Sequence, residues 1–292
     1  MDGQQWLAER FAEHRGHLRA VAYRMLGSLS EADDALQEAW LRAGRAHTAE
    51  VQNLAGWLTT IVARVCLNML RSRAHRQEEP LDMQAADPLL GPAAVGNPEA
   101  EVEMADSVGV ALLVVLDTLS PAERVAFVLH DLFAVPFEEI APLLERSPEA
   151  TRQLASRARR RVKGAPAPHR EPGRTREIVE AFLSATRGQD LRALITLLHP
   201  EVVLRADAAV MLTAAPVTVQ GAEAVAKGAM AAMQRARFTG LALLDGAVGL
   251  VMAPQGRLRV ALTFTIDDGL ITAVDVVAEP ERLGLLDVAV LD

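Results

Sequence analysis

Cysteine is almost absent from this sequence of 292 residues, which contains only Cys66. One cysteine forms no internal disulfide, and it cannot supply the several thiolates of a cysteine-based zinc site. Because Cys66 lies in an apolar run with helical periodicity, we expect it to be an inert core residue. No other pattern marks a set of ligands, so the sequence predicts neither a metal site nor a cofactor.

Long apolar runs are also missing. The longest uninterrupted stretches, such as residues 110–116, are far too short to span a bilayer. The first residues show no basic segment followed by an apolar one, which would mark a secretory signal. We therefore expect no membrane association and a cytoplasmic location.

Positive charge is missing from one stretch of the chain. From Gln77 to Glu123 there is no Lys or Arg, while ten acidic residues occur. The first part of this stretch contains four prolines, so it cannot form a continuous helix. We expect residues 77–100 to be an acidic linker. It is either a solvated tether or a strand that lies in a basic channel of a partner.

Positive charge is concentrated instead at residues 146–163, which contain seven Lys or Arg and one Glu. The whole chain, in contrast, has a net charge of −8. An amphipathic segment, 136–144, precedes a short turn. A second helix then opens at Pro148, with Ser147 able to cap it. This is the outline of a helix-turn-helix. A basic helix in an acidic protein needs a partner that neutralises it, and phosphate is the usual one.

Arginine-rich helix ends have a second explanation, since they are common as solvated faces and as favourable charge at the end of the helix dipole. The position of the polar residues favours DNA contact. They lie at helical spacing near the start of the second helix, the end that enters the major groove in this motif, and are Arg152, Gln153, Ser156 and Arg157.

The rest of the pattern predicts three domains and two linkers. Residues 1–76 and 101–163 have helical periodicity, whereas residues 174–292 start with helices and continue with β-like runs. Residues 77–100 and 164–173 are the expected linkers. The fold class is therefore multidomain. Two all-α domains precede an α+β domain, in which a curved antiparallel sheet wraps around two or three helices.

Several local signals set the expected element ends. Ser120-Pro121-Ala122-Glu123 is a capping box that starts a helix running through Leu132. A capping-type spacing from Ser30 to Asp33 opens a helix at 31–43, and a longer helix is expected from Leu54 to about Arg73. Asp267-Asp268-Gly269 is a hairpin signal.

Four segments, in this order, resemble the bacterial extracytoplasmic-function (ECF) sigma factors of the sigma-70 family. One such motif is weak, but four in sequence are specific, and the resemblance covers residues 5–163. The remainder resembles the SnoaL-like, NTF2-like domain found on the sigma-J-type branch of that family. The four segments are SEADDALQEAWLR at 30–42, WLTTIVAR at 57–64, LSPAER at 119–124 and RQLASRAR at 152–159.

The resemblance implies an RNA polymerase sigma factor whose partners are core RNA polymerase and the −10 and −35 elements of promoter DNA. In such factors an acidic helix docks on the polymerase clamp, here through Asp34, Gln37, Glu38 and Leu41. The loop and helix that follow melt and recognise the −10 element, here around Asn53, Arg64, Asn68 and Arg71. The helix-turn-helix recognises the −35 element, here through Arg152, Gln153, Ser156 and Arg157, with Arg160 and Arg161 beside them.

Two segments depart from the branch pattern. The Trp-Leu-Pro-Glu-Pro type of linker motif lacks its Trp here. The Asn-Pro-Asp-Lys-Leu type of motif near the C-terminal end is substituted. Contact between these two segments is thought to set activity in the branch, so the resemblance implies a regulatory contact at Glu279, Pro280, Glu281, Arg282 and Leu283.

Other functions compete with this interpretation. A dimeric repressor explains the helix-turn-helix but leaves the acidic helix without a role. A SnoaL-like cyclase would use His199, Asp207 or Asp275 as acid or base. A ligand sensor would bind an unknown small molecule in the same domain. We favour a non-enzymatic domain that regulates the chain without a ligand, because the sequence shows no convergent set of polar residues.

Overall fold

The computed structural model forms two compact units, divided as Met1–Gln84 with Leu116–Arg161 and as Ala85–Val115 with Val162–Asp292. Most of both predicted linkers, residues 78–100 and 165–171, lies outside the residues that the structure describes. The described residues are 3–46, 51, 53–77, 103–105, 108–164, 172–211, 215–232 and 236–291.

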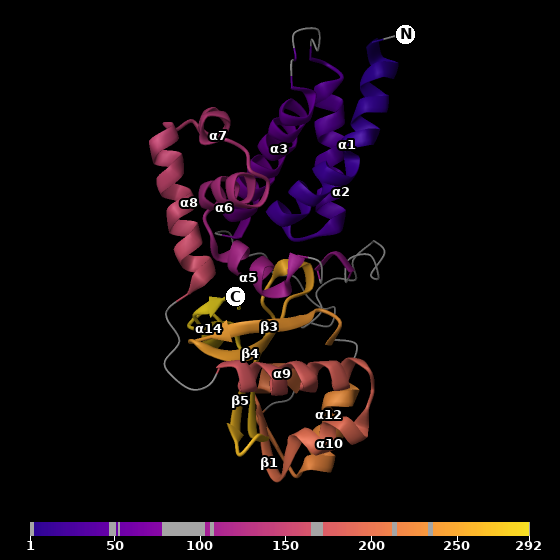
Figure 1. Cartoon of the computed structure of the whole chain (residues 1–292), viewed down its shortest axis with the longest axis vertical. Coiled ribbons are helices and arrows are strands. Elements are labelled where there is room, and N and C mark those ends of the chain that lie inside the picture. The colour runs from indigo at the N-terminus through magenta and orange to yellow at the C-terminus, as the bar shows by residue number, and fades with distance from the viewer. Residues whose placement is uncertain are drawn as a thin grey trace. The chain divides into compact units, whose positions relative to one another are not determined.

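The first unit is built from helices (Figure 1). They are α1 (Gly3–Leu26), α2 (Leu29–Ala43), α3 (Leu54–Gln77), the last residues of α5 (Val110–Thr118), α6 (Pro121–Phe127), the π-helical segment η1 (Val128–Leu132), α7 (Phe137–Leu144) and α8 (Pro148–Lys163). The helices α1, α2 and α3 pack on one another around fully buried side chains such as Leu18, Tyr23, Leu58 and Leu67. Cys66 is buried in this core, as predicted, and burial raises the pKa of its thiol.

The start of α2 differs from the predicted one. The helix begins at Leu29 after Ser28, and the Ser28 side chain makes no capping hydrogen bond. The capping role expected from Asp33 was wrong, because Arg19 of α1 donates two hydrogen bonds to the Asp33 carboxylate at 2.9 and 2.7 Å. Asp33 thus forms an ion pair with Arg19 of α1 and does not cap α2.

One polar cluster joins α3 to α6. Arg124 of α6 is 2% exposed, and its Nη1 donates to Asp117 Oδ1 at 3.3 Å. Asp117 also lies 3.9 Å from Arg73 of α3, which pairs with Glu31 of α2. Burial lowers the pKa of Arg124, and the nearby Asp117 carboxylate opposes that shift. Within the described part of the chain, Nε and Nη2 of Arg124 have no hydrogen-bond partner.

The helix predicted to run through Leu132 changes its winding at Val128. Residues 128–132 form the π-helical segment η1, which is a rare turn often found at functional sites. The ring of His130 in η1 stacks on Phe137 of α7 at a centroid distance of 3.8 Å, and its Nδ1 lies 3.1 Å from the Val135 carbonyl oxygen. The segment η1 thus fixes the start of α7.

The second unit combines a seven-stranded sheet with helices (Figure 1). The sheet order is β2-β1-β6-β5-β4-β3-β7. The strands are β1 (Leu198–Ala206), β2 (Val217–Gln220), β3 (Thr239–Leu244), β4 (Ala247–Met252), β5 (Val260–Asp267), β6 (Leu270–Val277) and β7 (Val288–Ala289). The helical elements are α9 (Pro172–Arg187), α10 (Leu191–Leu197), α11 (Ala208–Met211), α12 (Ala222–Ala231), η2 (Pro254–Gly256) and α14 (Pro280–Leu283).

The hairpin predicted at Asp267-Asp268-Gly269 is confirmed, with Asp268 and Gly269 at φ of 48° and 83°. The apolar run at 241–251 contains most of β3, a turn at Asp245-Gly246 and most of β4. The sheet was predicted to be antiparallel, but among the described strands β1 and β6 are parallel, and the other pairs are antiparallel.

Candidate nucleic-acid interface

The predicted helix-turn-helix is present at α7 and α8. The helix α7 ends at Leu144, and Glu145 takes the left-handed conformation at φ of 55°. The Ser147 hydroxyl oxygen accepts a hydrogen bond from the Ala150 amide at 3.1 Å, which caps α8. Pro148 is the first residue of α8, so the predicted turn and helix start are both confirmed.

The helix α8 has one buried and one exposed face. Thr151, Ala155 and Ala158 are fully buried and hold the helix against the unit. The side chains predicted to contact DNA are all exposed, and they are Arg152, Gln153, Ser156, Arg157, Arg160 and Arg161. The predicted set therefore occupies the solvent side of α8, where a nucleic acid can reach it.

Neighbouring groups hold several arginines of α8 in place. Arg157 Nε donates to Glu123 Oε1 at 2.9 Å, and Arg161 Nη1 donates to the Thr118 carbonyl oxygen at 2.9 Å. The Arg152 guanidinium carbon lies 5.3 Å from the Phe137 ring centroid, within the range of a cation–π contact. These contacts restrict the arginine side chains before any partner binds.

Glu123 links the start of α6 to α8. It forms the predicted capping box with Ser120, whose hydroxyl donates to Glu123 Oε2 at 2.7 Å. Its other carboxylate oxygen accepts the bond from Arg157. Burial raises the pKa of Glu123, but the hydrogen bonds from Ser120 and Arg157 outweigh burial and lower the pKa below its usual value. The capping box was predicted from the sequence, whereas the hydrogen bond from Arg157 to Glu123 was not.

Asp131 of η1 holds another arginine of α8, Arg159, in the same way as Glu123 holds Arg157. Its Oδ1 accepts a hydrogen bond from Arg159 Nε at 2.5 Å. Both side chains keep partial exposure, and neither was singled out from the sequence. Their pairing depends on the π-helical winding of η1, which the sequence pattern did not indicate.

The helix α2 has an exposed face made of the four residues expected to bind polymerase. They recur at helical spacing and are Asp34, Gln37, Glu38 and Leu41. Leu41 is 53% exposed, which is unusual for a leucine in the described residues, and Glu38 pairs with Arg42 at 2.8 Å. The opposite face of α2, including Ala35 and Leu36, is buried. The four residues predicted to bind polymerase thus share one exposed face of α2.

The helix α3 presents a second exposed face. Arg64, Asn68 and Arg71 lie on one side of the helix at spacings of four and three residues, and all three are exposed. Leu67 and Leu70 lie on the buried side. Two cations and one amide on a single helix face can contact phosphates and base edges together.

The predicted regulatory segment is held by Asp207. The Asp207 carboxylate is buried, and its Oδ2 accepts hydrogen bonds from the Ala278 and Glu279 amides at 2.7 and 2.9 Å. It also lies 3.7 Å from Arg282 Nη1. Pro280, Glu281 and Arg282 are exposed on α14, whereas Leu283 is buried. Asp207 thus anchors the backbone at the start of α14.

The two other acid or base candidates also have local partners. His199 Nδ1 accepts a hydrogen bond from the Glu201 amide at 3.2 Å. Asp275 pairs with Arg205 across two neighbouring strands at 3.5 Å. Within the described ranges, no group of three or more His, Cys, Asp or Glu is arranged to hold a metal ion. In the same ranges, every helix is too short or too polar to cross a membrane.

Known proteins match the chain along nearly all of its length. Residues 10–76 match the family Sigma-70 region 2, and residues 109–162 match Sigma-70, region 4. The chain is 36% identical to the ECF RNA polymerase sigma factor SigJ of Mycobacterium tuberculosis, with 93% of this chain and 91% of that protein covered. It is 34% identical to the probable ECF RNA polymerase sigma factor SigI of the same species, with 92% of each covered.

A solved structure matches as well. The crystal structure of Mycobacterium tuberculosis SigJ covers 95% of this chain and 98% of its own, at 32% identity and a TM-score of 0.45.

The two matched regions define the class, a transcription factor with sigma-70 regions 2 and 4 on the helices of the first unit. With a relative of 36% identity along nearly the whole chain, the chain belongs to the ECF RNA polymerase sigma factors. It is therefore a sigma factor that acts with core RNA polymerase at promoter DNA, and so a transcription regulator. The resemblance inferred from the four motifs and the predicted fold class are confirmed.

Proposed function

We propose that the exposed faces of α2, α3 and α8 each bind a different partner of a sigma factor. The helix α2 contacts core polymerase through Asp34, Gln37, Glu38 and Leu41. The helix α3 contacts the −10 element through Arg64, Asn68 and Arg71. The helix α8 contacts the −35 element, with Arg152, Gln153, Ser156 and Arg157 at base edges and Arg160 and Arg161 at phosphates.

The two-sided character of α8 carries this proposal. Its buried side consists of small residues that let the helix sit closely on the unit, and its other side gathers the cations and the amide of Gln153. Arginine pairs with guanine and glutamine with adenine in the major groove, so this face has the chemistry to distinguish base pairs. A solvated face needs no such amide beside the arginines.

The α+β domain is proposed to adjust transcription through the segment 279–283. Asp207 holds this segment in one conformation while Pro280, Glu281 and Arg282 stay exposed. A fixed, exposed segment is suited to contact another part of the chain, and the family resemblance supports the acidic linker as that part. The proposed domains are 1–76, 101–163 and 174–292, and the proposed location is cytoplasmic.

Run-off transcription from fragmented genomic DNA of the source organism, with purified core polymerase, tests the proposal. We expect transcripts with defined start sites only when the full chain is added, and many fewer with the double variant Arg152→Ala, Gln153→Ala. The control variant Arg192→Ala removes an exposed arginine from α10 and should leave the transcripts unchanged. Full transcript levels from the double variant would contradict the proposed role of α8.

The regulatory part has its own test in the same assay. Arg282→Ala removes the exposed cation beside Asp207, and we expect a changed transcript yield from unchanged start sites. Arg205→Ala removes another exposed cation of the second unit, paired with Asp275, and serves as the matched control. Equal yields from both variants and the unmodified chain would remove Arg282 from the regulation.

A further inference from the structure

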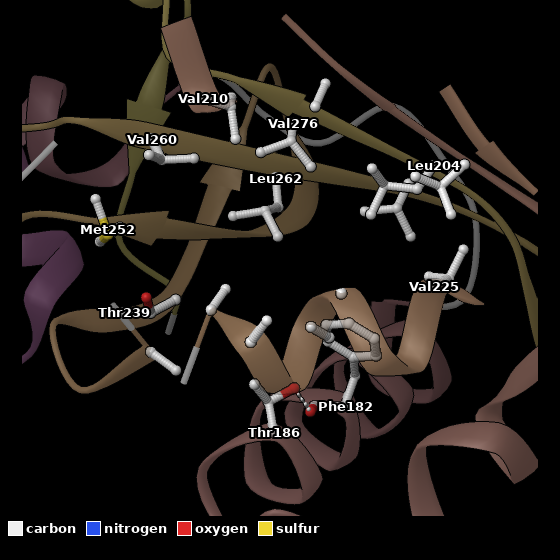
Figure 2. Close-up of a pocket in the computed structure, with 18 of the residues that line it drawn as sticks. Phe182, Thr186, Leu204, Val210, Val225, Thr239, Met252, Val260, Leu262 and Val276 are labelled. Carbon is white, nitrogen blue, oxygen red and sulfur yellow. Dashed lines mark hydrogen bonds between the residues drawn. The ribbon is translucent and has the colours of Figure 1, made fainter. Parts of the chain in front are cut away.

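The α+β unit contains a cavity of about 510 Å³ between its helices and its sheet. Figure 2 shows Phe182 and Thr186 of α9 on one side of this space and Leu262 and Val276 of the sheet on the other. The volume falls within the range of roughly 300–1,000 Å³ that is typical of small-molecule pockets. It is therefore large enough for a ligand.

The lining of the cavity is almost entirely apolar. Among the described residues that line it there is no charged side chain, and only Thr186 and Thr239 bring hydroxyl groups. The Thr186 hydroxyl donates to the Phe182 carbonyl oxygen at 2.8 Å, which leaves its oxygen able to accept one hydrogen bond. His199, Asp207 and Asp275, the acid and base candidates, are not among these lining residues. The cavity thus offers shape and apolar contact, without a group for acid or base chemistry.

Small residues of α12 keep the space open. Ala224, Gly228, Ala229 and Ala231 all line it, and a Cβ atom built on Gly228 would meet no other atom within 4 Å. The ring of Phe182, which also lines the cavity, makes an edge-to-face contact with Phe264 at 5.4 Å. Protein interiors normally fill such volumes, because each void forfeits packing contacts. Ala224, Gly228 and Ala231 are exposed, so the small residues of α12 line the side of the cavity that opens to solvent.

We propose that this cavity is a binding site for an uncharged, largely apolar small molecule with few hydrogen-bond donors, for which the Thr186 hydroxyl oxygen is an acceptor. A charged ligand is disfavoured because contact with the apolar walls would remove part of its hydration and the described lining offers no counter-charge. This inference departs from the ligand-free domain favoured by the sequence. The absence of convergent polar residues argues against a polar ligand only, and an apolar ligand does not need them.

Fluorescence of N-phenyl-1-naphthylamine, an uncharged apolar dye that brightens in apolar surroundings, tests the site on the full chain. We expect saturable binding by the unmodified chain and binding weakened at least ~tenfold in Gly228→Leu and in Ala229→Leu, because leucine would fill the space. Leucine is a better helix former than glycine, so Gly228→Leu should still fold. The matched control Lys227→Leu adds the same side chain to α12 outside the lining, and its affinity should stay unchanged.

Competition defines the chemical class. Decan-1-ol should displace the dye at concentrations at least ~tenfold lower than decanoate at pH 8, because only decanoate must lose the hydration of a charge. Equal displacement by both would overturn the proposed class. Lack of saturable dye binding, or equal binding by Gly228→Leu, Ala229→Leu and the unmodified chain, would overturn the site. The assay contains neither polymerase nor DNA, so its failure would leave the sigma function untouched.

Discussion

Arg157 and Arg161 are both exposed on α8, but their surroundings assign them different tasks. Arg157 is held by the Glu123 carboxylate and follows Arg152, Gln153 and Ser156, the other residues proposed to meet base edges. Arg161 is bonded to a backbone carbonyl near the other end. We therefore propose that Arg157 discriminates base pairs and that Arg161 adds charge that any sequence of DNA would attract.

Substituting these two arginines should therefore have different results. Arg157→Ala is expected to cost about 1–3 kcal/mol at one base pair of the −35 element and to relax preference there. Arg161→Ala should weaken binding evenly across promoter variants. Quantitative binding of holoenzyme to a panel of single-base promoter variants checks both. If the two variants gave the same profile, the division of roles would be wrong.

We predict that the thiol of Cys66 is unreactive in the folded chain. Burial raises its pKa, so the reactive thiolate is rare at neutral pH as well as inaccessible. We expect a thiol reagent such as Ellman's reagent to leave the native chain unmodified and to modify one thiol per chain in denaturant. Rapid reaction of the native chain would show that the α1–α3 core opens.

At the scale of elements, the Ser120–Glu123 capping box should make the first unit sensitive to acid. The pKa of Glu123 is lower in the folded chain than in the unfolded chain, so its contribution to stability is complete above the unfolded value of 4.5. That contribution is lost as the pH falls through the folded pKa. Glu123→Gln keeps a capping side chain without the titration, and its free energy of unfolding should depend less on pH below 4.5. Urea denaturation at several pH values measures this, and identical pH slopes would exclude Glu123.

The exposed face of α2 gives a further prediction for one element. Gln37→Ala combined with Glu38→Ala should lower affinity for core polymerase without altering promoter preference, because these side chains lie on the exposed face. The matched control is Arg10→Ala with Glu13→Ala, which removes an exposed pair from α1. The measurement is the affinity of each variant for fluorescently labelled core polymerase. Unchanged binding by the α2 variant would exclude this face from the interface.

Elements with strong local signals were predictable from the sequence. Ser147-Pro148 fixed the start of α8, and Asp268-Gly269 fixed the β5–β6 hairpin, because those residues favour the required backbone conformations. Elements set by distant contacts were not predictable. Asp33 has the right spacing for a cap, but Arg19, fourteen residues away, takes its carboxylate.

The candidate sites were predictable only in part for the same reason. Helical spacing placed the polar residues of α2, α3 and α8 on exposed faces, and the structure agrees. Spacing could not reveal that Glu123 and Asp131 hold arginines of α8, since these contacts join residues 34 and 28 positions apart. The cavity was equally hidden, because it depends on how α12 meets the sheet.

At the scale of the whole molecule, stability depends on a buried charge between α3 and α6. Asp117→Ala should lower the free energy of unfolding by about 3 kcal/mol, because it leaves Arg124 buried without its carboxylate. Arg124→Met removes the charge and keeps most of the volume, so its cost should be below about 1 kcal/mol. Urea denaturation of both variants makes the comparison. Losses of equal size would show that packing by Arg124, rather than its charge, stabilises this contact.

The π-helical turn η1 should make residues 128–132 sensitive to the deletion of a single residue. Removing one residue from 128–132 would convert this turn to ordinary α-helix, because a π-helical turn contains one residue more than an α-helical turn, and would turn the side chains within it to new directions. His130 would then leave the Phe137 ring, and Asp131 would leave Arg159, in one mutational step. Evolution is therefore expected to accept substitutions within this turn more readily than a one-codon deletion, so the length of this stretch should be preserved among close relatives.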